Sequence, residues 1–171
     1  MTSGRQFHIR WSGPGDLDRI MEIYEHARAF MSMHGNPGQW IDGYPSRDLI
    51  VSEIEALHSY VCENADGDIV GTFCLIIGED PTYRVIEQGR WLSDNPYGTI
   101  HRLASDGRAH GIAATCIDWC WQRIHNLRAD THADNTIMQH ILTGAGFIRC
   151  GTIYTDNGSP RIAYQKEDVP A

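Results

Sequence analysis

Lysine is almost absent from this sequence: only Lys166 among the 14 basic residues is a lysine, and 22 acidic residues bring the formal net charge to −8. Binding of nucleic acid depends on clustered basic side chains that displace counterions from phosphates, so this acidic balance argues against nucleic acid as a partner. The lack of lysine also excludes a P-loop nucleotide site, because that motif requires Gly-Lys followed by Ser or Thr.

Long apolar runs and paired cysteines are lacking as well. No run approaches the roughly 18 apolar residues of a membrane-spanning helix, and residues 1–10 lack the apolar stretch of a secretory signal. The five cysteines form no C-x-x-C pair, which is typical of reduced core residues in a cytosolic protein. We therefore expect a cytoplasmic protein with no membrane partner.

The chain length predicts one domain over residues 1–171, because such a chain buries about 70% of its unfolded surface without a metal or disulfide. Apolar periodicity and turn residues predict strands at 7–11, 60–63, 69–77, 97–103, 127–131, 147–155 and 161–164, with a short one around Val85. They predict helices at 16–33, 46–57, 111–125 and 134–143, the second capped by Ser46. Hairpin turns join some strands and helices separate others, so we expect an α/β fold whose mixed sheet carries helices on both faces.

A strand, a tight break and a helix follow one another in residues 99–119, with small residues at Ala109, Gly111 and Ala113. The first turn of a helix leaves about four N–H groups without partners and carries roughly half a positive charge. Small residues let a ligand approach that backbone, which makes a pocket suited to a pyrophosphate. A simple strand-to-helix turn that needs a glycine has the same residues, so this segment alone leaves both interpretations open.

Two motifs in this half of the chain match a known pattern. Residues 108–113 read Arg-Ala-His-Gly-Ile-Ala and match the signature R/Q-x-x-G-x-G/A, and residues 130–135 read Asp-Thr-His-Ala-Asp-Asn and lead into a predicted helix followed by Gly146-Phe147. With the element order of residues 7–164, this pair of motifs resembles the GNAT superfamily of acyl-CoA-dependent N-acetyltransferases. The resemblance implies the GNAT fold and acetyl-CoA as a cosubstrate.

The resemblance also assigns places for the coenzyme. The strand at residues 102–104 would pair with the pantetheine arm, with a bulge that orients the thioester, and a backbone N–H near Leu103 would bind the oxyanion. Asn135 matches the family asparagine that contacts the coenzyme. The pyrophosphate would be bound by the N–H groups of Arg108, Ala109, His110, Gly111, Ile112 and Ala113. The Arg108 guanidinium is either a partner of a coenzyme phosphate or a solvated side chain at the helix start.

Two residues depart from the family pattern. Ala113 replaces the glycine that often closes the signature, which narrows the loop but still permits backbone donation. Leu142 stands where many members carry a tyrosine that protonates the leaving thiolate. The acid is therefore another residue, with Tyr154 as one candidate, or the solvent.

Proton transfer from the amine also needs a candidate group. Strand alternation places Tyr97, Thr99, His101 and Leu103 on one face, although a bulge would shift this register. We identify His101 as the candidate base or water-positioning group, because imidazole titrates near neutral pH. Tyr97 is a candidate base relay or acid. The alternatives are a His101 that only hydrogen-bonds within the sheet and a Tyr97 that only packs.

A metal site is not expected. The alternating residues Asp130, His132 and Asp134 resemble a ligand set, but strand alternation and capping of the following helix by Asp134 explain them.

The acceptor amine is expected near the irregular segment that follows the first long helix. In GNAT folds the first two helices and their connection form much of the acceptor site, which implies Trp40 and Tyr44 as substrate-binding residues. An irregular segment rich in polar and aromatic residues suits a small polar substrate. An ordinary loop pinned by Trp40 is the alternative.

These observations predict an N-acetyltransferase that moves an acetyl group from acetyl-CoA to a primary amine by direct attack on the thioester. The acceptor is a small molecule or a peptide N-terminus, and the surplus of carboxylates is free to attract a cationic amine. Other acyl groups, a protein lysine as acceptor, and an acyl-CoA sensor without turnover stay open as alternatives. Homodimers are common in the family, but this sequence specifies no interface for a homodimer.

Overall fold

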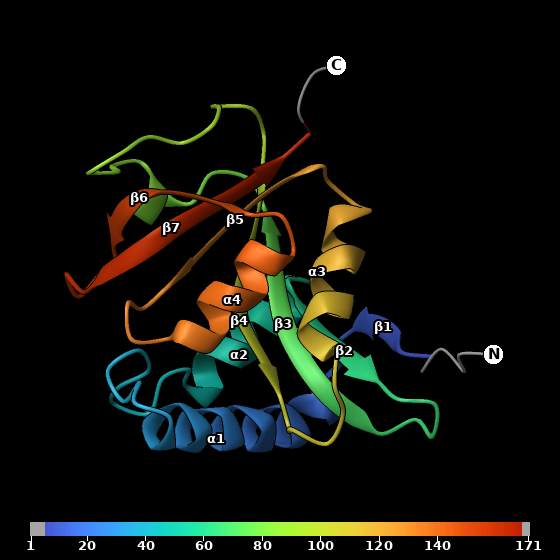
Figure 1. Cartoon of the computed structure of the whole chain (residues 1–171). Helices are drawn as coiled ribbons and strands as arrows, with labels where there is room; N and C mark the ends of the chain where they lie inside the picture. Colours follow the sequence, from blue (N-terminus) through green and yellow to red (C-terminus); the bar gives the residue numbers. More distant parts are fainter. Residues whose placement is uncertain (1–5, 169–171) are drawn as a thin grey trace.

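The computed structural model describes residues 6–168. Its strands are β1 (His8–Trp11), β2 (Ser59–Glu63), β3 (Ile69–Ile77), β4 (Gly98–Ser105), β5 (Asn126–Thr131), β6 (Ile148–Tyr154) and β7 (Pro160–Glu167) (Figure 1). Its helices are α1 (Leu17–Met33), α2 (Arg47–Glu55), α3 (Ile112–Trp121) and α4 (Thr136–Gly144), with the short 3-10 turns η1 (Pro14–Asp16) and η2 (Pro81–Tyr83). None of the helices within residues 6–168 has the length and apolar character needed to cross a bilayer.

All the strands belong to one seven-stranded sheet with the order β1-β2-β3-β4-β5-β7-β6. Neighbours are antiparallel everywhere except between β4 and β5, which run parallel. The prediction of a mixed sheet is confirmed.

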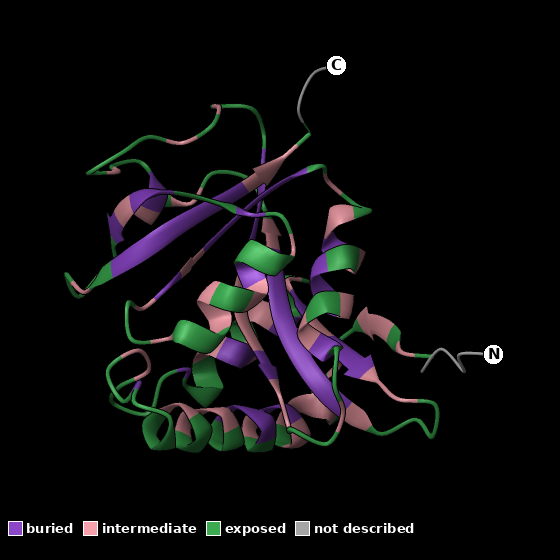
Figure 2. Cartoon of the chain, in the orientation of Figure 1, coloured by how far each residue is buried: buried purple, intermediate pink, exposed green. Residues whose placement is uncertain are grey.

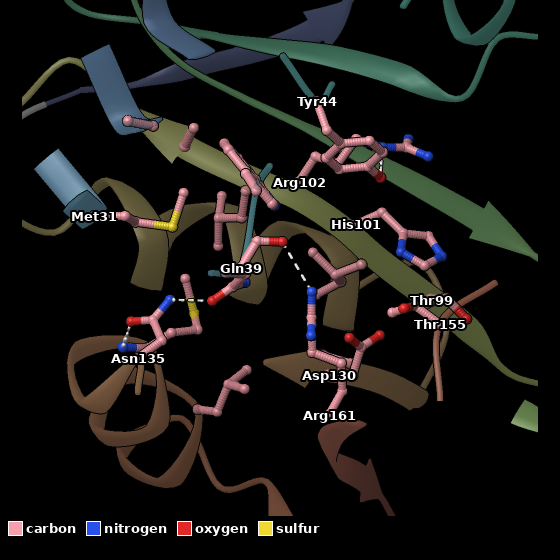
Figure 3. Close-up of a pocket in the computed structure, with 18 of the residues that line it drawn as sticks. Met31, Gln39, Tyr44, Thr99, His101, Arg102, Asp130, Asn135, Thr155 and Arg161 are labelled. Carbon is pink, nitrogen blue, oxygen red and sulfur yellow. Dashed lines mark hydrogen bonds between the residues drawn. The ribbon is translucent and has the colours of Figure 1, made fainter. Parts of the chain in front are cut away.

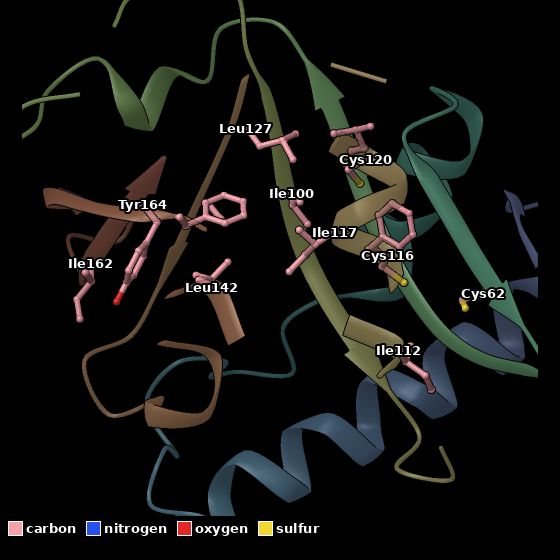
Figure 4. Packing of buried hydrophobic residues seen from close by; sticks show 14 of the residues in the cluster. Cys62, Ile100, Ile112, Cys116, Ile117, Cys120, Leu127, Leu142, Ile162 and Tyr164 are labelled. Atoms are coloured by element: carbon pink, nitrogen blue, oxygen red, sulfur yellow. The ribbon is translucent and has the colours of Figure 1, made fainter. Parts of the chain in front are cut away.

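Helices cover both faces of this sheet, as predicted. Successive residues of a strand point to opposite faces, and Cys62 belongs to the core under α3 and α4 whereas Val61 belongs to the core under α1 and α2. Figure 2 shows the buried residues along the middle strands and on the inward faces of the helices. Figure 4 shows the α3 side, where Ile112, Cys116 and Cys120 of the helix point at the sheet.

Short-range signals account for the boundaries of several elements. The hydroxyl of Ser46 accepts a hydrogen bond from the N–H of Leu49 at 3.1 Å, which is the predicted cap of α2. The hairpin between β2 and β3 is closed by Asn64, whose side-chain oxygen accepts from the N–H groups of Asp66 and Asp68.

Two local predictions were wrong. No strand forms around Val85, which is 65% exposed; the chain makes the η2 turn instead, because the Asp80 carboxylate accepts from the N–H of Thr82 and starts a turn there. Asp134 does not cap α4. The cap is the next residue, Asn135, whose side-chain oxygen accepts from the N–H of Met138 at 3.0 Å.

Candidate active site

A cavity of about 900 Å³ lies where β4 and β5 separate (Figure 3). The two strands pair only at Gly98 with Leu127 and at Thr99 with Arg128. Beyond these pairs, residues 100–105 of β4 line the cavity, opposite Ala129 and Asp130 of β5. Because the facing strand edges are unpaired here, their N–H and C=O groups need partners that the sheet itself does not provide.

A β-bulge in β4 shapes one wall of this cavity. Thr72 of β3 pairs with Ala104, and the next pair is Cys74 with His101, so β4 advances by one residue more than β3 between the two pairs. One residue of β3 therefore faces two residues of β4, which are Arg102 and Leu103. Arg102 has a φ of +55°, a conformation that non-glycine residues seldom adopt. The bulge interrupts the regular pairing at Arg102 and Leu103, at the position expected from the GNAT resemblance.

The Arg102 side chain connects the bulge to the expected acceptor segment. Its Nε donates to the hydroxyl of Tyr44 at 2.7 Å, and its Nη1 lies 3.3 Å from the Glu53 carboxylate. Trp40 packs edge-on against both Tyr44 and the buried Tyr24. Trp40 and Tyr44 both line the cavity, so the structure brings together the residues predicted to bind the acceptor.

The start of α3 offers unpaired backbone donors at the other end of the cavity, which Ile112 and Ala113 line while Ala109, His110 and Gly111 lie beside it in the chain. The N–H groups of Ala109, His110, Gly111, Ile112 and Ala113 donate to no residue within 6–168. Gly111 has a φ of +81°, and a Cβ atom added there would meet nothing within 4 Å. Five free donors around open space at a helix N-terminus form a cradle that fits a pyrophosphate.

Arg108 lies beside these N–H groups, but its own hydrogen-bond donors are already paired with carboxylates. Its N–H donates to the Asp106 carboxylate at 3.0 Å, and its guanidinium pairs with Asp106 and, at 3.6 Å, with Asp68. Burial alone would raise the pKa of Asp106, but the N–H and guanidinium of Arg108 lower it below its usual value. A phosphate would have to compete with these carboxylates, so the role of Arg108 toward the coenzyme stays a prediction.

His101 points into the cavity and is paired with a carboxylate that the sequence did not reveal. Its Nε2 lies 2.9 Å from Oδ2 of Asp80, and both side chains are mostly buried. Burial would raise the pKa of Asp80, but hydrogen bonds from His101 and Thr82 outweigh it and lower that pKa to about 2. An ionised carboxylate only accepts, so the pairing places a proton on Nε2 of His101.

Tyr97 lies outside the residues that line the cavity. It precedes β4, and its ring packs against the Arg128 guanidinium, whose Cζ atom is 3.9 Å from the ring centroid. Its hydroxyl accepts from the N–H of Asp80 at 2.8 Å. The geometry therefore suits Tyr97 to positioning Asp80, and its role as a base relay or acid stays a prediction.

Gln39 joins the segment between α1 and α2 to the start of α4. Its side-chain oxygen accepts from Asn135 at 2.9 Å and from Asn36 at 2.9 Å. Its backbone oxygen accepts from Nη2 of Arg161 at 2.8 Å (Figure 3). Asn135 thus lines the cavity with its side chain shared between the helix cap and this bridge, and its contact with the coenzyme stays a prediction.

Sequence reasoning placed Gln39 in the acceptor segment but missed Asp80 and Arg161, which also line the cavity. Each comes from a segment between or at the end of regular elements, where periodicity carries no information. Asp80 had one usable signal, since Asp followed by Pro and Thr is typical of a capped turn.

The chain has close structural counterparts. A GNAT-family acetyltransferase from Streptococcus agalactiae 2603 superposes with a TM-score of 0.86 and 35% sequence identity, covering 96% of each chain. The chain belongs to the GNAT family of acetyltransferases.

More distant structures share the fold of this GNAT protein. A GNAT-family acetyltransferase from Listeria monocytogenes 4b F2365 has a TM-score of 0.71 and 21% identity over 98% of each chain. A chain of the NatC complex bound to Gag peptide and CoA has a TM-score of 0.56 and 15% identity over 96% of this chain and 99% of its own. The sequence matches no family model and no curated protein.

One departure from the GNAT pattern is visible in the cavity wall. Leu142, which takes the place of the usual tyrosine, is 3% exposed and packs in the core under α3 and α4 while lining the cavity. Tyr154, the alternative acid, is 41% exposed, donates its hydroxyl hydrogen to Glu87 and does not line this cavity. No hydroxyl replaces the missing tyrosine at position 142.

Replacing Gly111 by Trp is expected to raise the Kd for CoA by at least about tenfold, because the side chain would fill the cradle. The φ of +81° adds roughly 1–2 kcal/mol of backbone strain. Isothermal titration calorimetry measures the affinity. Gly158→Trp is the matched control, since Gly158 has the same φ of +81° and open space in the turn after β6. Equal CoA affinity in the Gly111 variant and the wild type would contradict a coenzyme site at this helix.

Proposed function

We propose that this GNAT protein transfers the acetyl group of acetyl-CoA to a primary amine of a small molecule. The observation that carries the proposal is the opening between β4 and β5, which leads from the free N–H groups at the start of α3 to His101 and Asp80. Acetyl-CoA carries amide groups, a thioester and a pyrophosphate. These groups match, in order, the unpaired strand edges, the bulge and the helix N-terminus along the cavity.

Backbone donors would hold the coenzyme. The N–H groups from Ala109 to Ala113 suit the pyrophosphate, which explains how an acidic protein binds a polyanion with few cations. The unpaired edges of β4 and β5 suit the amides of the pantetheine arm. The oxyanion that forms during attack would be bound by the N–H of Leu103 at the bulge, since preorganised donors stabilise developing charge.

The acceptor end of the cavity carries a surplus of negative charge. Glu79, Asp80, Asp130 and Asp156 line it, and Asp42 lies on the connecting segment beside Tyr44. These carboxylates attract a cationic amine and hold it near the thioester. A cation must lose a proton before it becomes a nucleophile, so a base is needed at the same place.

We assign this role to His101. With Nε2–H directed at the ionised Asp80, Nδ1 accepts a proton from the ammonium, directly or through a water. The amine lone pair then forms a bond to the thioester carbon while the Leu103 region stabilises the oxyanion. The C–S bond breaks as the carbonyl re-forms, and the positively charged amide nitrogen loses its second proton to solvent. The thiolate takes a proton from solvent because Leu142 has none to give.

Release of free thiol from acetyl-CoA across a panel of primary amines tests this proposal. We expect at least one small amine to give turnover well above the hydrolysis rate, with an acetylated product identified by mass spectrometry. The same assay with longer acyl-CoA donors, and with a folded lysine-containing protein as acceptor, separates the alternative acyl groups and acceptors. Tight CoA binding without turnover on any amine would contradict the proposal and favour an acyl-CoA sensor, the alternative that Leu142 supports.

Replacing His101 by Gln is expected to lower kcat/KM about a hundredfold and to abolish the acid limb of its pH profile. The base would be missing, whereas CoA affinity should stay unchanged, because the pyrophosphate cradle is at the other end of the cavity. His140→Gln is the control, since His140 is exposed on α4 and does not line the cavity. An unaltered acid limb in the His101 variant would remove this residue from the mechanism.

A further inference from the structure

Arg161, at the start of β7, is a buried cation that lines the cavity. It is 7% exposed, and it has no carboxylate oxygen within 4 Å among the residues of the range 6–168. Burying an uncompensated charge is costly, so such a residue is retained in proteins where a ligand or another group compensates it. Apart from its hydrogen bond to Gln39, Arg161 has no role in the proposed binding of the coenzyme or in catalysis.

The hydrogen bonds of Arg161 fix its orientation but do not use all its donors. Nη1 donates to the hydroxyl of Ser159 and to the carbonyl oxygen of Pro160, and Nη2 donates to the carbonyl oxygen of Gln39 at 2.8 Å. A guanidinium has five N–H bonds, so one on Nε and one on Nη2 are left without an acceptor within residues 6–168. These two nitrogens form one edge of the guanidinium, which is the edge that binds a carboxylate side-on.

An unpaired carboxylate lies on the same face of the sheet. Asp130 of β5 is in register with Ala163 of β7, and Arg161 is two residues before Ala163, so both side chains point into the cavity. Oδ2 of Asp130 accepts from the hydroxyl of Tyr83 at 2.6 Å, which leaves Oδ1 available. The two opposite charges are thus each held by neighbours, more than 4 Å apart, instead of pairing with each other.

We propose that Arg161 binds a carboxylate of the acceptor, which makes the acceptor an amine that also carries an acid group, with a free amino acid as the simplest case. Asp130 attracts the ammonium end of such a zwitterion, and Arg161 fixes its carboxylate at the opposite end. This inference rests on the proposed function and names the substrate class of the same site.

The coenzyme does not account for Arg161. Its charged phosphates belong at the start of α3, where the free N–H groups are, and its pantetheine arm carries no charge. Arg161 comes instead from the β6–β7 turn region, next to Gln39 of the segment that carries Trp40 and Tyr44. A carboxylate held there would be separated from the phosphates by the length of the opening between β4 and β5.

The test compares kcat/KM for the twenty amino acids with kcat/KM for their carboxamides, which keep the amine and the side chain but lose the negative charge. For the preferred amino acid we expect the wild type to favour the acid over the amide by tenfold to a hundredfold, roughly the effect of a hydrogen-bonded charge. Arg161→Gln should reduce this ratio to about one. Arg161→Lys, which keeps the charge but not the two-nitrogen edge, should give an intermediate ratio.

The ratio separates recognition from a structural role. If Arg161 only anchors Gln39, its loss lowers the rates for acid and amide equally and the ratio stays constant, which would overturn the proposal. A ratio near one in the wild type, or weaker CoA binding in Arg161→Gln with an unchanged ratio, would overturn it as well. Arg149→Gln is the matched control, because Arg149 is exposed on β6 and should leave the ratio unchanged.

Failure of the proposed function is distinguishable from failure of this inference. If no amine gives turnover, calorimetric titration of the CoA-loaded wild type with each amino acid and amide replaces the kinetic ratio. Binding of an amino acid that Arg161→Gln abolishes would support the carboxylate site even in a sensor. No preference for acids over amides in binding would overturn it.

Discussion

The separation of β4 and β5 is the structural constraint on which the candidate site depends. Two parallel strands in the middle of a sheet pair at only two positions, Gly98 with Leu127 and Thr99 with Arg128, and then separate. Their outer edges stay paired, with β3 through a bulge and with β7 over the full length of β5. The inner edges face a cavity with unsatisfied backbone groups, which a sheet tolerates where a ligand completes the ladder.

Charge is distributed along this opening in a way that reconciles an acidic protein with an anionic cosubstrate. In the proposed function the phosphate end relies on backbone N–H groups and the α3 dipole, and the neighbouring cation Arg108 is paired with Asp106. The acceptor end carries carboxylates and the His101–Asp80 pair, and Arg161 is its buried cation without a carboxylate partner in the described range. The proposed function therefore needs lysine in neither place and gives the surplus of acidic residues a role in attracting the amine.

Much of the fold could be predicted because its signals are local. Ser46, the Asn64 hairpin and the alternation along β2 and β3 act within a few residues, and the glycine at 111 shows the start of α3 directly. The site is less predictable because its contacts join distant segments: Gln39 meets Asn135 and Arg161, and Asp80 meets His101. No periodicity encodes such pairs. Alternation does group Tyr97 with His101, since both rings lie beside Tyr83 and both side chains bond to Asp80, but it does not show which of them lines the cavity.

An amide NMR titration of the ¹⁵N-labelled protein with CoA reports directly on the backbone groups proposed to hold the coenzyme. We expect the largest chemical-shift changes at Ala109–Ala113 and along the facing edges of β4 and β5, including Leu103, with small changes in β1 and β2. Changes confined to other surfaces, or saturation without any effect at Gly111 and Leu103, would contradict the proposed coenzyme site.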